Sequence, residues 1–309
     1  MFKSFEKSSG KSLKNSLNLF AMLSIDPKTL PIPQLHGYLM GAVGPRPIAF
    51  ASTIDKEGRP NLAPFSFFNV FSSNPPILVF SPNRSGRTGV TKHSHDNVLE
   101  VPEVVINVVD YDMVYQMSLA SSPYEKGVDE FTKAGFTKLA STVVKPFRVA
   151  ESPVQFECKV TEVKELGQAG GAGNLIFCEV VMIHIKDEVL SAAGTIDQQK
   201  IDLVSRMGGN WYCRAHGDAL FEIEKPITTL GVGVDALPES IRNSKVLTGN
   251  NLGQLGNIET LPSADEIAQM KAKGIATLTE EQLHLEIKKL VDVNAVKEAW
   301  TLMLASDLK

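Results

Sequence analysis

Two long stretches of alternating hydrophobic and polar residues constrain the fold of this chain more than any other feature. They are VQFECKVTEVKEL, residues 154–166, and NLIFCEVVMIHIKDEVL, residues 174–190, and the glycine-rich stretch GQAGGAG separates them. Alternation with a period of two is typical of β-strands that bury one face. A short glycine-rich connection between two such strands predicts an antiparallel pair.

Shorter strand patterns fill most of residues 38–226. PIAFASTID (47–55) alternates and runs into the turn KEGRPN, while PILVFSP (76–82) and EVVINVVD (103–110) are continuous apolar runs. Helical patterns here are short, one within 111–122 and one at the end of 85–100. Many short strands with few helices predict a mainly β fold and favour a closed or partly open β-barrel.

The pattern changes after Pro226. SADE (263–266) and TEEQ (279–282) are capping boxes that open amphipathic stretches, and residues 293–306 have hydrophobic positions near helical spacing. Gly274 is a candidate end for the first of these helices. We therefore predict a helical C-terminal extension at 227–309 that packs on the barrel or on a partner subunit, with a lid over a site as the alternative.

The remaining composition limits the class of protein. Residues 1–25 hold four lysines by position 14 and several serines, which predicts a flexible tail, with a targeting peptide as the alternative. A net charge of −4 argues against nucleic-acid binding, and no apolar run has the length of a membrane span. Three cysteines without a C-x-x-C pair favour a reducing, cytoplasmic setting.

An ordered set of motifs resembles the flavin reductase-like, FMN-binding split-barrel family. The set is GPRPIAFASTIDKEGRPNLAPFSFFNVFSSNPPILVFSP, then TKHSHDN, EVVINVVD and VAESPVQFECKV, and the resemblance covers roughly residues 36–225. It implies a Greek-key split barrel over residues 26–226, usually a homodimer with flavin bound near the subunit interface. Many family members pass a hydride from NADH or NADPH to flavin.

The resemblance assigns the flavin ring to the segment PFSFFN. Its main-chain amides would meet the polar edge of the ring, and its phenyl groups would support the loop from behind. These residues are Ser66, Phe67, Phe68 and Asn69. A phenylalanine-rich core strand is the alternative reading of the same residues.

Two further groups complete the predicted cofactor site. Lys92, Ser94 and Asn97 match the family pattern K-D-T-x-x-N, with lysine as the cation for a phosphate and serine in place of threonine. His93 stands where the family has aspartate, which leaves the geometry of that contact open. Arg46, Ser52 and Thr53 could contact the phosphate or the ribityl chain, with a surface or interface role as the alternative.

A later segment, SRMGGNWYCRAH, resembles the family pattern R-x-G-G-x-x-Y, and the resemblance implies a place at the nicotinamide side or at the dimer interface. It supplies Arg206 and His216 as candidate residues there. The two histidines of HSHD (93–96) lack further spaced ligands, so we predict no metal site. We identify no catalytic acid or base, because flavin itself carries the hydride chemistry.

Three functions are compatible with these residues. The first is an FMN-dependent oxidoreductase that uses NADH or NADPH and supplies reduced flavin to a small acceptor or a monooxygenase partner. The second is a non-catalytic FMN-binding protein or electron carrier. The third is a structural or interaction protein that has lost flavin, which the departure at His93 favours and the intact PFSFFN segment opposes.

Overall fold

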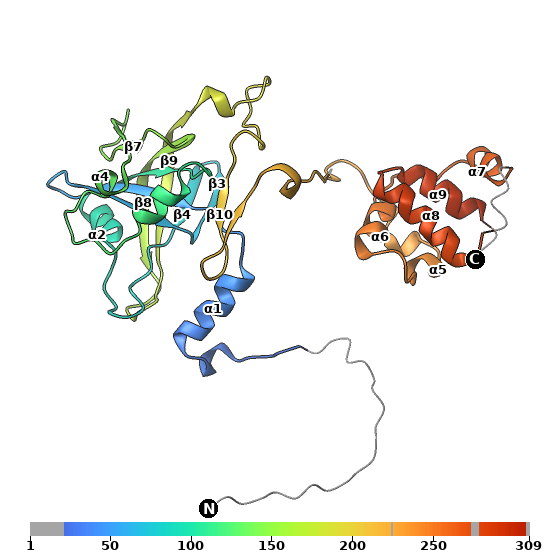
Figure 1. Ribbon diagram of the computed structural model, residues 1–309, viewed down its shortest axis with the longest axis horizontal. Helices are drawn as coiled ribbons and strands as arrows, with labels where there is room; N and C mark the ends of the chain where they lie inside the picture. The colour runs from blue at the N-terminus through green and yellow to red at the C-terminus, as the bar shows by residue number, and fades with distance from the viewer. Residues whose placement is uncertain (1–21, 224, 273–277, 307–309) are drawn as a thin grey trace, which may run out of the picture. The chain divides into compact units, whose positions relative to one another are not determined.

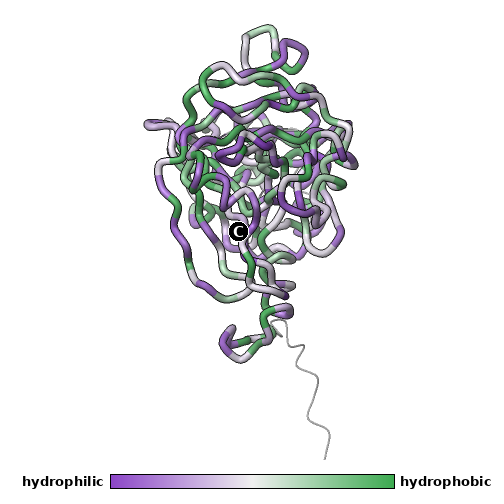
Figure 2. Tube along the Cα trace, turned by 90° about the vertical axis from the view of Figure 1, so that its left-hand side faces the viewer, coloured by the Kyte–Doolittle hydropathy of each residue, from purple (hydrophilic) through white to green (hydrophobic). Residues whose placement is uncertain are grey.

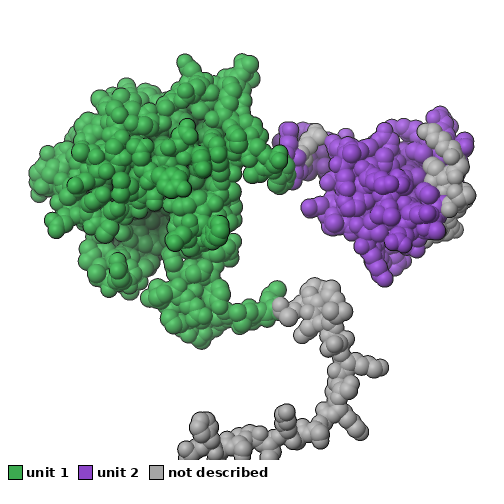
Figure 3. Space-filling model, in the orientation of Figure 1, with its two compact units in different colours: residues 1–221 green, residues 222–309 purple. Residues whose placement is uncertain are grey.

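The computed structural model describes residues 22–223, 225–272 and 278–306. The chain divides into two compact units, residues 1–221 (unit 1) and 222–309 (unit 2), which Figure 3 distinguishes by colour. Most of the predicted N-terminal tail and the predicted helix end at Gly274 lie outside the described residues. In the part that is described, no helix is long and apolar enough to cross a membrane.

Unit 1 is built on one antiparallel sheet of seven strands (Figure 1). The strands are β1 (Ala49–Ile54), β2 (Pro60–Phe65), β3 (Phe68–Ser73), β4 (Pro76–Phe80), β5 (Glu103–Asn107), β8 (Val154–Glu165) and β9 (Asn174–Ile185). Their order across the sheet is β2-β1-β5-β8-β9-β4-β3. The prediction of a mainly β fold with short helices is therefore confirmed.

The two edge strands of this sheet follow each other in the sequence. Only Ser66 and Phe67 connect β2 to β3, and the N–H of Ser81 donates to the carbonyl of Phe67 at 2.8 Å. The sheet must therefore curve until its two edges lie within reach of a two-residue link. We call the Ser66–Phe67 link the seam; closure of the sheet into a Greek-key barrel stays a prediction.

The two long alternating stretches form the predicted antiparallel pair, β8 with β9. Their register shifts twice, between Glu157 and Cys158 and again between Val160 and Glu162, where bulges bend the strands. Figure 2 shows the hydrophobic and hydrophilic residues that alternate along the chain. The bulges explain why the alternation is imperfect over so long a run.

Both faces of the sheet are covered at β1, whereas most residues of the edge strand β3 are exposed. In β1 all six residues are buried; Phe50 packs in one hydrophobic cluster, with Met117 and Phe131, while Ala49 and Ala51 pack in another, with Phe80 and Ile106. The helices of unit 1 are α1 (Ile32–Ala42), α2 (His93–Glu100), α3 (Val114–Leu119) and α4 (Glu130–Ala134). The smaller elements are η1 (Pro27–Thr29), β6 (Lys138–Leu139), β7 (Arg148–Val149), η2 (Asp187–Val189), β10 (Val204–Arg206), β11 (Tyr212–Arg214) and η3 (Gly217–Ala219).

The helix α1 was not predicted. It buries none of its residues, although hydrophobic residues recur at helical spacing at Ile32, Leu35 and Leu39. The guanidinium of Arg46 holds its C-terminal end, because Nη1 donates to the carbonyls of Met40 and Val43 while Nη2 donates to Met207 at 2.9 Å. These bonds tie α1 to the β10–β11 hairpin.

Unit 2 is helical. It contains η4 (Val234–Ala236), α5 (Glu239–Arg242), α6 (Gly249–Gly256), α7 (Ala264–Lys271), α8 (Glu280–Asp292) and α9 (Val296–Ala305). Both predicted capping boxes are present, Ser263 with Glu266 and Thr279 with Gln282. Its core surrounds Trp300, whose indole N–H donates to the carbonyl of Leu255 at 2.7 Å.

Candidate functional site

A cavity of about 760 Å³ opens in unit 1 at the seam. Three stretches of the chain form most of its wall: residues 63–67 around the seam, residues 81–94 between β4 and α2, and residues 120–124 after α3. His36, Asn61 and Glu130 complete the lining. This volume lies within the range of about 300–1,000 Å³ that small-molecule and cofactor sites occupy.

The N-terminus of α2 faces this cavity. Lys92 is the N-cap residue and makes no side-chain capping bond, and Lys92, His93 and Ser94 all line the wall. Among the described residues, the N–H groups of His93 and Ser94 have no protein acceptor. A helix start with free N–H groups and a positive dipole end is suited to an anion such as a phosphate.

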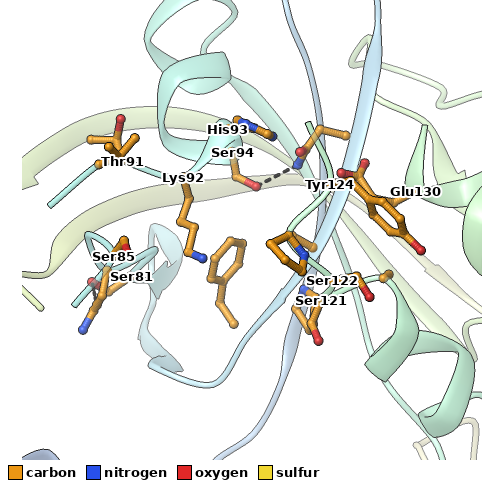
Figure 4. Close-up of a pocket in the computed structure, with 18 of the residues that line it drawn as sticks. Ser81, Ser85, Thr91, Lys92, His93, Ser94, Ser121, Ser122, Tyr124 and Glu130 are labelled. Atoms are coloured by element: carbon orange, nitrogen blue, oxygen red, sulfur yellow. Dashed lines mark hydrogen bonds between the residues drawn. The ribbon is translucent and has the colours of Figure 1, made fainter. Parts of the chain in front are cut away.

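Two cations without a counter-charge share the same wall. Lys92 and Arg87 line the cavity, and neither forms an ion pair with any acidic residue that the structure describes. In Figure 4 the ammonium of Lys92 points into the space between Ser81 and Ser85 on one side and Ser121 and Ser122 on the other. The cavity therefore has a positive end with several hydroxyl groups around it.

The seam contributes main-chain donors and aromatic rings to the cavity rather than charge. The main-chain N–H groups of Ser66 and Phe67 have no acceptor within the described part of the chain. Phe65 and Phe67 line the wall, and Phe65 packs on Phe80 with ring centroids 5.4 Å apart. Free N–H donors beside supported aromatic rings fit a flat heterocycle with a polar edge.

Two buried hydrogen bonds fix α2 against the sheet. The amide of Asn61 donates to Ser94 Oγ at 2.9 Å, and the amide of Asn97 donates to Thr53 Oγ1 at 3.1 Å. All four of these side chains are at least nine-tenths buried. They position the helix start without themselves carrying charge.

Glu130 is the one carboxyl group of the described cavity lining. It is 4% exposed, and its Oε2 accepts the N–H of Leu62 at 3.0 Å. Burial raises the pKa of Glu130, and nearby Asp129 adds to the rise, while the bond from Leu62 works against it. No lysine or arginine of the described chain pairs with this carboxyl.

The structure brings four of the predicted site residues to the cavity. These are Ser66, Phe67, Lys92 and Ser94. The others do not line it: Arg46, Ser52, Thr53, Phe68, Asn69, Asn97, Arg206 and His216. For these eight residues a direct contact with a ligand stays a prediction.

Most of the eight have structural partners instead. Ser52 and Thr53 are completely buried in β1, so neither hydroxyl is exposed in unit 1. Burial, followed by the charge of Arg206, lowers the pKa of Arg46, whose guanidinium already serves three carbonyls. Arg206 lies over the ring of Tyr212 at 4.5 Å, and His216 Nδ1 lies 3.5 Å from Asp202.

The sequence reasoning missed His36, Asn61, Tyr124 and Glu130. His36 comes from the unpredicted helix α1, and its ring meets Phe67 edge-on with centroids 6.4 Å apart. Tyr124 and Glu130 come from loops and a five-residue helix that join the wall only in three dimensions. The only local indication for Glu130 in the sequence is a carboxyl group next to the hydrophobic residues of EFTKAGF, residues 130–136.

Two solved structures are similar in fold to this protein. The structure is similar to nitrilotriacetate monooxygenase component B from Bacillus cereus, with a TM-score of 0.62 and 29% identity over 66% of this chain and 100% of that one. It is also similar to 2-nitrobenzoate 2-nitroreductase NbaA from Pseudomonas fluorescens, with a TM-score of 0.57 and 25% identity over 68% of this chain and 100% of that one.

Sequence comparison defines the family. An uncharacterized protein of Aquifex aeolicus is 35% identical over 190 residues, which span 61% of this chain and 94% of that protein. The family model described as "flavin reductase like domain" matches residues 40–201, which include the seam, α2 and Glu130. The chain therefore belongs to the flavin reductase-like family.

Proposed function

We propose that this protein is an FMN-dependent oxidoreductase that takes electrons from NADH or NADPH. The observation that carries the proposal is that one cavity contains both the start of α2, with its cation Lys92, and the seam, with its free N–H groups and phenyl rings. The two parts match the two ends of FMN, which has a phosphate and a flat ring with a polar edge. Family membership supports the same ligand.

The chain's residues bind and orient the cofactor in this proposal. Lys92, Arg87 and the free N–H groups of α2 would hold the phosphate, and the N–H groups of Ser66 and Phe67 would meet the ring. When bound, FMN supplies the ability to accept and release a hydride. No side chain has to act as an acid or base while the flavin takes up the hydride from nicotinamide.

Retention of serine at position 94 fits this arrangement. Its hydroxyl is buried against Asn61 and thus orients the helix start. His93 also lines the cavity, so the residue that departs from the family's aspartate belongs to the proposed phosphate site itself.

The test is anaerobic addition of NADH or NADPH to protein loaded with FMN and freed of excess. Bleaching of the flavin band by one nucleotide supports the oxidoreductase and identifies the donor. A bound band that persists with both nucleotides contradicts it and supports the electron-carrier alternative. Failure to retain or bind FMN, checked by titration, contradicts both.

We also propose that the protein is a homodimer. Val70 and Phe71 on the edge strand β3 are 60% and 68% exposed, and Ile183 on β9 is 50% exposed. Large apolar side chains on an edge strand favour pairing with another chain. Light scattering of the full chain tests this: a mass of two chains supports it and a mass of one contradicts it.

A monooxygenase partner is a further proposal. The similarity to component B of a nitrilotriacetate monooxygenase supports the transfer of reduced flavin to a separate enzyme. The similarity to a nitroreductase supports direct reduction of a small organic acceptor instead. Release of FMN upon reduction, measured by ultrafiltration under nitrogen, favours the first role, and retention of reduced FMN favours the second.

A further inference from the structure

We propose that Glu130 donates a proton to an organic two-electron acceptor bound in this cavity, an α,β-unsaturated carbonyl compound. This inference rests on the proposed flavin function and goes beyond it, because it names an acceptor class and the residue that completes its reduction. Flavin binding and the uptake of hydride from nicotinamide require no such group.

The position of Glu130 is the first support. Its carboxyl lines the cavity while 4% of the residue is exposed, so it is shielded from bulk water yet faces the space a ligand would fill. Leu62 N–H donates to Oε2, and the main-chain N–H of Glu130 also acts on the carboxyl; we assign the transferable proton to Oε1. The helix α4, which starts at Glu130 and is capped by Asp129, fixes the main chain from which the carboxyl extends.

The charge environment is the second support. Lys92 and Arg87 belong to the segment 81–94 between β4 and α2, while Glu130 belongs to α4. In Figure 4, Tyr124 and Glu130 lie across the cavity from Ser81 and Ser85. No cation among the described residues neutralises this carboxyl, and burial raises its pKa, so the group keeps a proton to a higher pH than an exposed glutamate.

The surrounding groups favour a neutral carbonyl compound. Ser122 and Tyr124 line the same side of the cavity and carry hydroxyl groups that can donate to a carbonyl oxygen. Pro123 and the ring of Tyr124, in the same stretch of the lining, provide apolar surface for a conjugated carbon skeleton.

The step balances as follows. Reduced FMN, held by Lys92, Arg87 and the seam, would supply the hydride that adds to the β-carbon of the acceptor. The electron pair of the carbon–carbon double bond then forms a bond at the α-carbon to the proton that leaves Glu130 Oε1. The product is the saturated carbonyl compound, and the Glu130 carboxylate regains its proton from water at the mouth of the cavity.

The experiment compares Glu130→Gln with the wild type. Glutamine keeps an oxygen for Leu62 N–H but releases no proton, so the fold is retained and an unfolding curve verifies this. NAD(P)H-driven reduction of cinnamaldehyde, which needs a proton, is measured against ferricyanide, a one-electron acceptor that needs none. Loss of general acid catalysis costs about 10²–10⁴-fold, so we expect the cinnamaldehyde-to-ferricyanide rate ratio to fall about 100-fold or more.

Two further measurements test whether Glu130 is the source of the proton. In the wild type, the rate of cinnamaldehyde reduction falls as pH rises through the pKa of Glu130. In Glu130→Gln, this fall in rate is absent from the pH profile. In the flavin-free protein, difference infrared spectra of wild type against Glu130→Gln show a protonated carboxyl that titrates above the ordinary value of about 4.3. The matched control is Glu125→Gln, which removes an exposed carboxyl outside the cavity lining and should retain the wild-type ratio.

The outcomes separate this inference from the proposed function. An unchanged rate ratio in Glu130→Gln, with normal bleaching of flavin by nicotinamide nucleotide, overturns the role of Glu130 alone. Titration of the carboxyl at the ordinary value, or wild-type protein that reduces ferricyanide but not cinnamaldehyde, also overturns it. A flavin that no nucleotide bleaches contradicts the proposed function itself.

Discussion

The side chain of Asn61 on β2 donates a 2.9 Å hydrogen bond to Ser94 Oγ in the first turn of α2. The strand that leads to the seam thereby also fixes the helix start that faces the cavity. The two parts of the candidate flavin site are thus held together by a buried pair of neutral groups. Their relative position depends on this contact rather than on the mobile ends of charged side chains.

Replacement Asn61→Leu is expected to lower the free energy of unfolding by roughly 1–3 kcal/mol, because Ser94 Oγ loses its only hydrogen-bond partner among the described residues. FMN affinity should fall with it. Urea unfolding and fluorescence titration measure the two effects. The double variant Asn61→Leu/Ser94→Ala should be more stable than Asn61→Leu alone, since it leaves no unpaired hydroxyl; additive losses would contradict the account.

Arg46→Lys tests whether Arg46 serves the fold or the ligand. Lysine lacks the planar fork that reaches Met40, Val43 and Met207 together, so the free energy of unfolding should fall by roughly 2 kcal/mol. Amide hydrogen exchange over residues 39–46 should accelerate. The preference for FMN over riboflavin should persist; its loss would instead support a phosphate contact by Arg46.

The stability of unit 1 should depend on pH through Glu157. Although burial raises its pKa, the N–H groups of Thr142, Val143 and Val144, together with His184, outweigh burial and hold the pKa below the ordinary value. A lowered pKa in the folded state adds stability above the unfolded-state value of about 4.3, and this stability is lost as pH falls through the folded-state value.

Glu157→Gln should therefore unfold at lower urea concentration than the wild type at pH 7, by roughly 1.5–3 kcal/mol. The difference should shrink as pH falls below the unfolded-state value of about 4.3 and toward the lowered folded-state value, where the wild-type carboxylate becomes protonated. Urea unfolding at pH 7, 5 and 3 measures it. An equal difference at all three values would show that the charge of Glu157 contributes nothing.

Trp300→Ala should destabilise unit 2 by roughly 3–5 kcal/mol, because it removes a large, completely buried ring from the core and frees the carbonyl of Leu255. The cavity belongs to unit 1, so FMN affinity should stay at the wild-type value. Thermal unfolding followed by circular dichroism, with a parallel FMN titration, checks both. A parallel loss of FMN binding would support the lid alternative for the helical extension.

The sequence was informative wherever a local pattern determines structure. Alternation identified β8 and β9, and the capping boxes at Ser263 and Thr279 marked helix starts in unit 2. The resemblance also selected Ser66, Phe67, Lys92 and Ser94, which the fold brings to one cavity.

Local patterns failed where position depends on distant contacts. The helix α1 has hydrophobic residues at helical spacing but buries none of them, and no local pattern reveals the approach of His36 to Phe67. Glu130 reaches the cavity because α4 packs on β2, a contact between residues 68 positions apart in the chain. Arg46 stands at a position where the resemblance implies a possible contact with flavin, yet its guanidinium donates hydrogen bonds to three main-chain carbonyls.

The most direct test of the central claim compares FMN with riboflavin, which lacks the phosphate, in titrations of wild type, Lys92→Gln and the exposed control Lys56→Gln. We predict that the wild type and Lys56→Gln bind FMN more tightly than riboflavin. Lys92→Gln should lose about tenfold or more of its FMN affinity and little of its riboflavin affinity. Equal affinity of the wild type for both ligands, or equal losses for both in Lys92→Gln, would contradict a phosphate site at the start of α2.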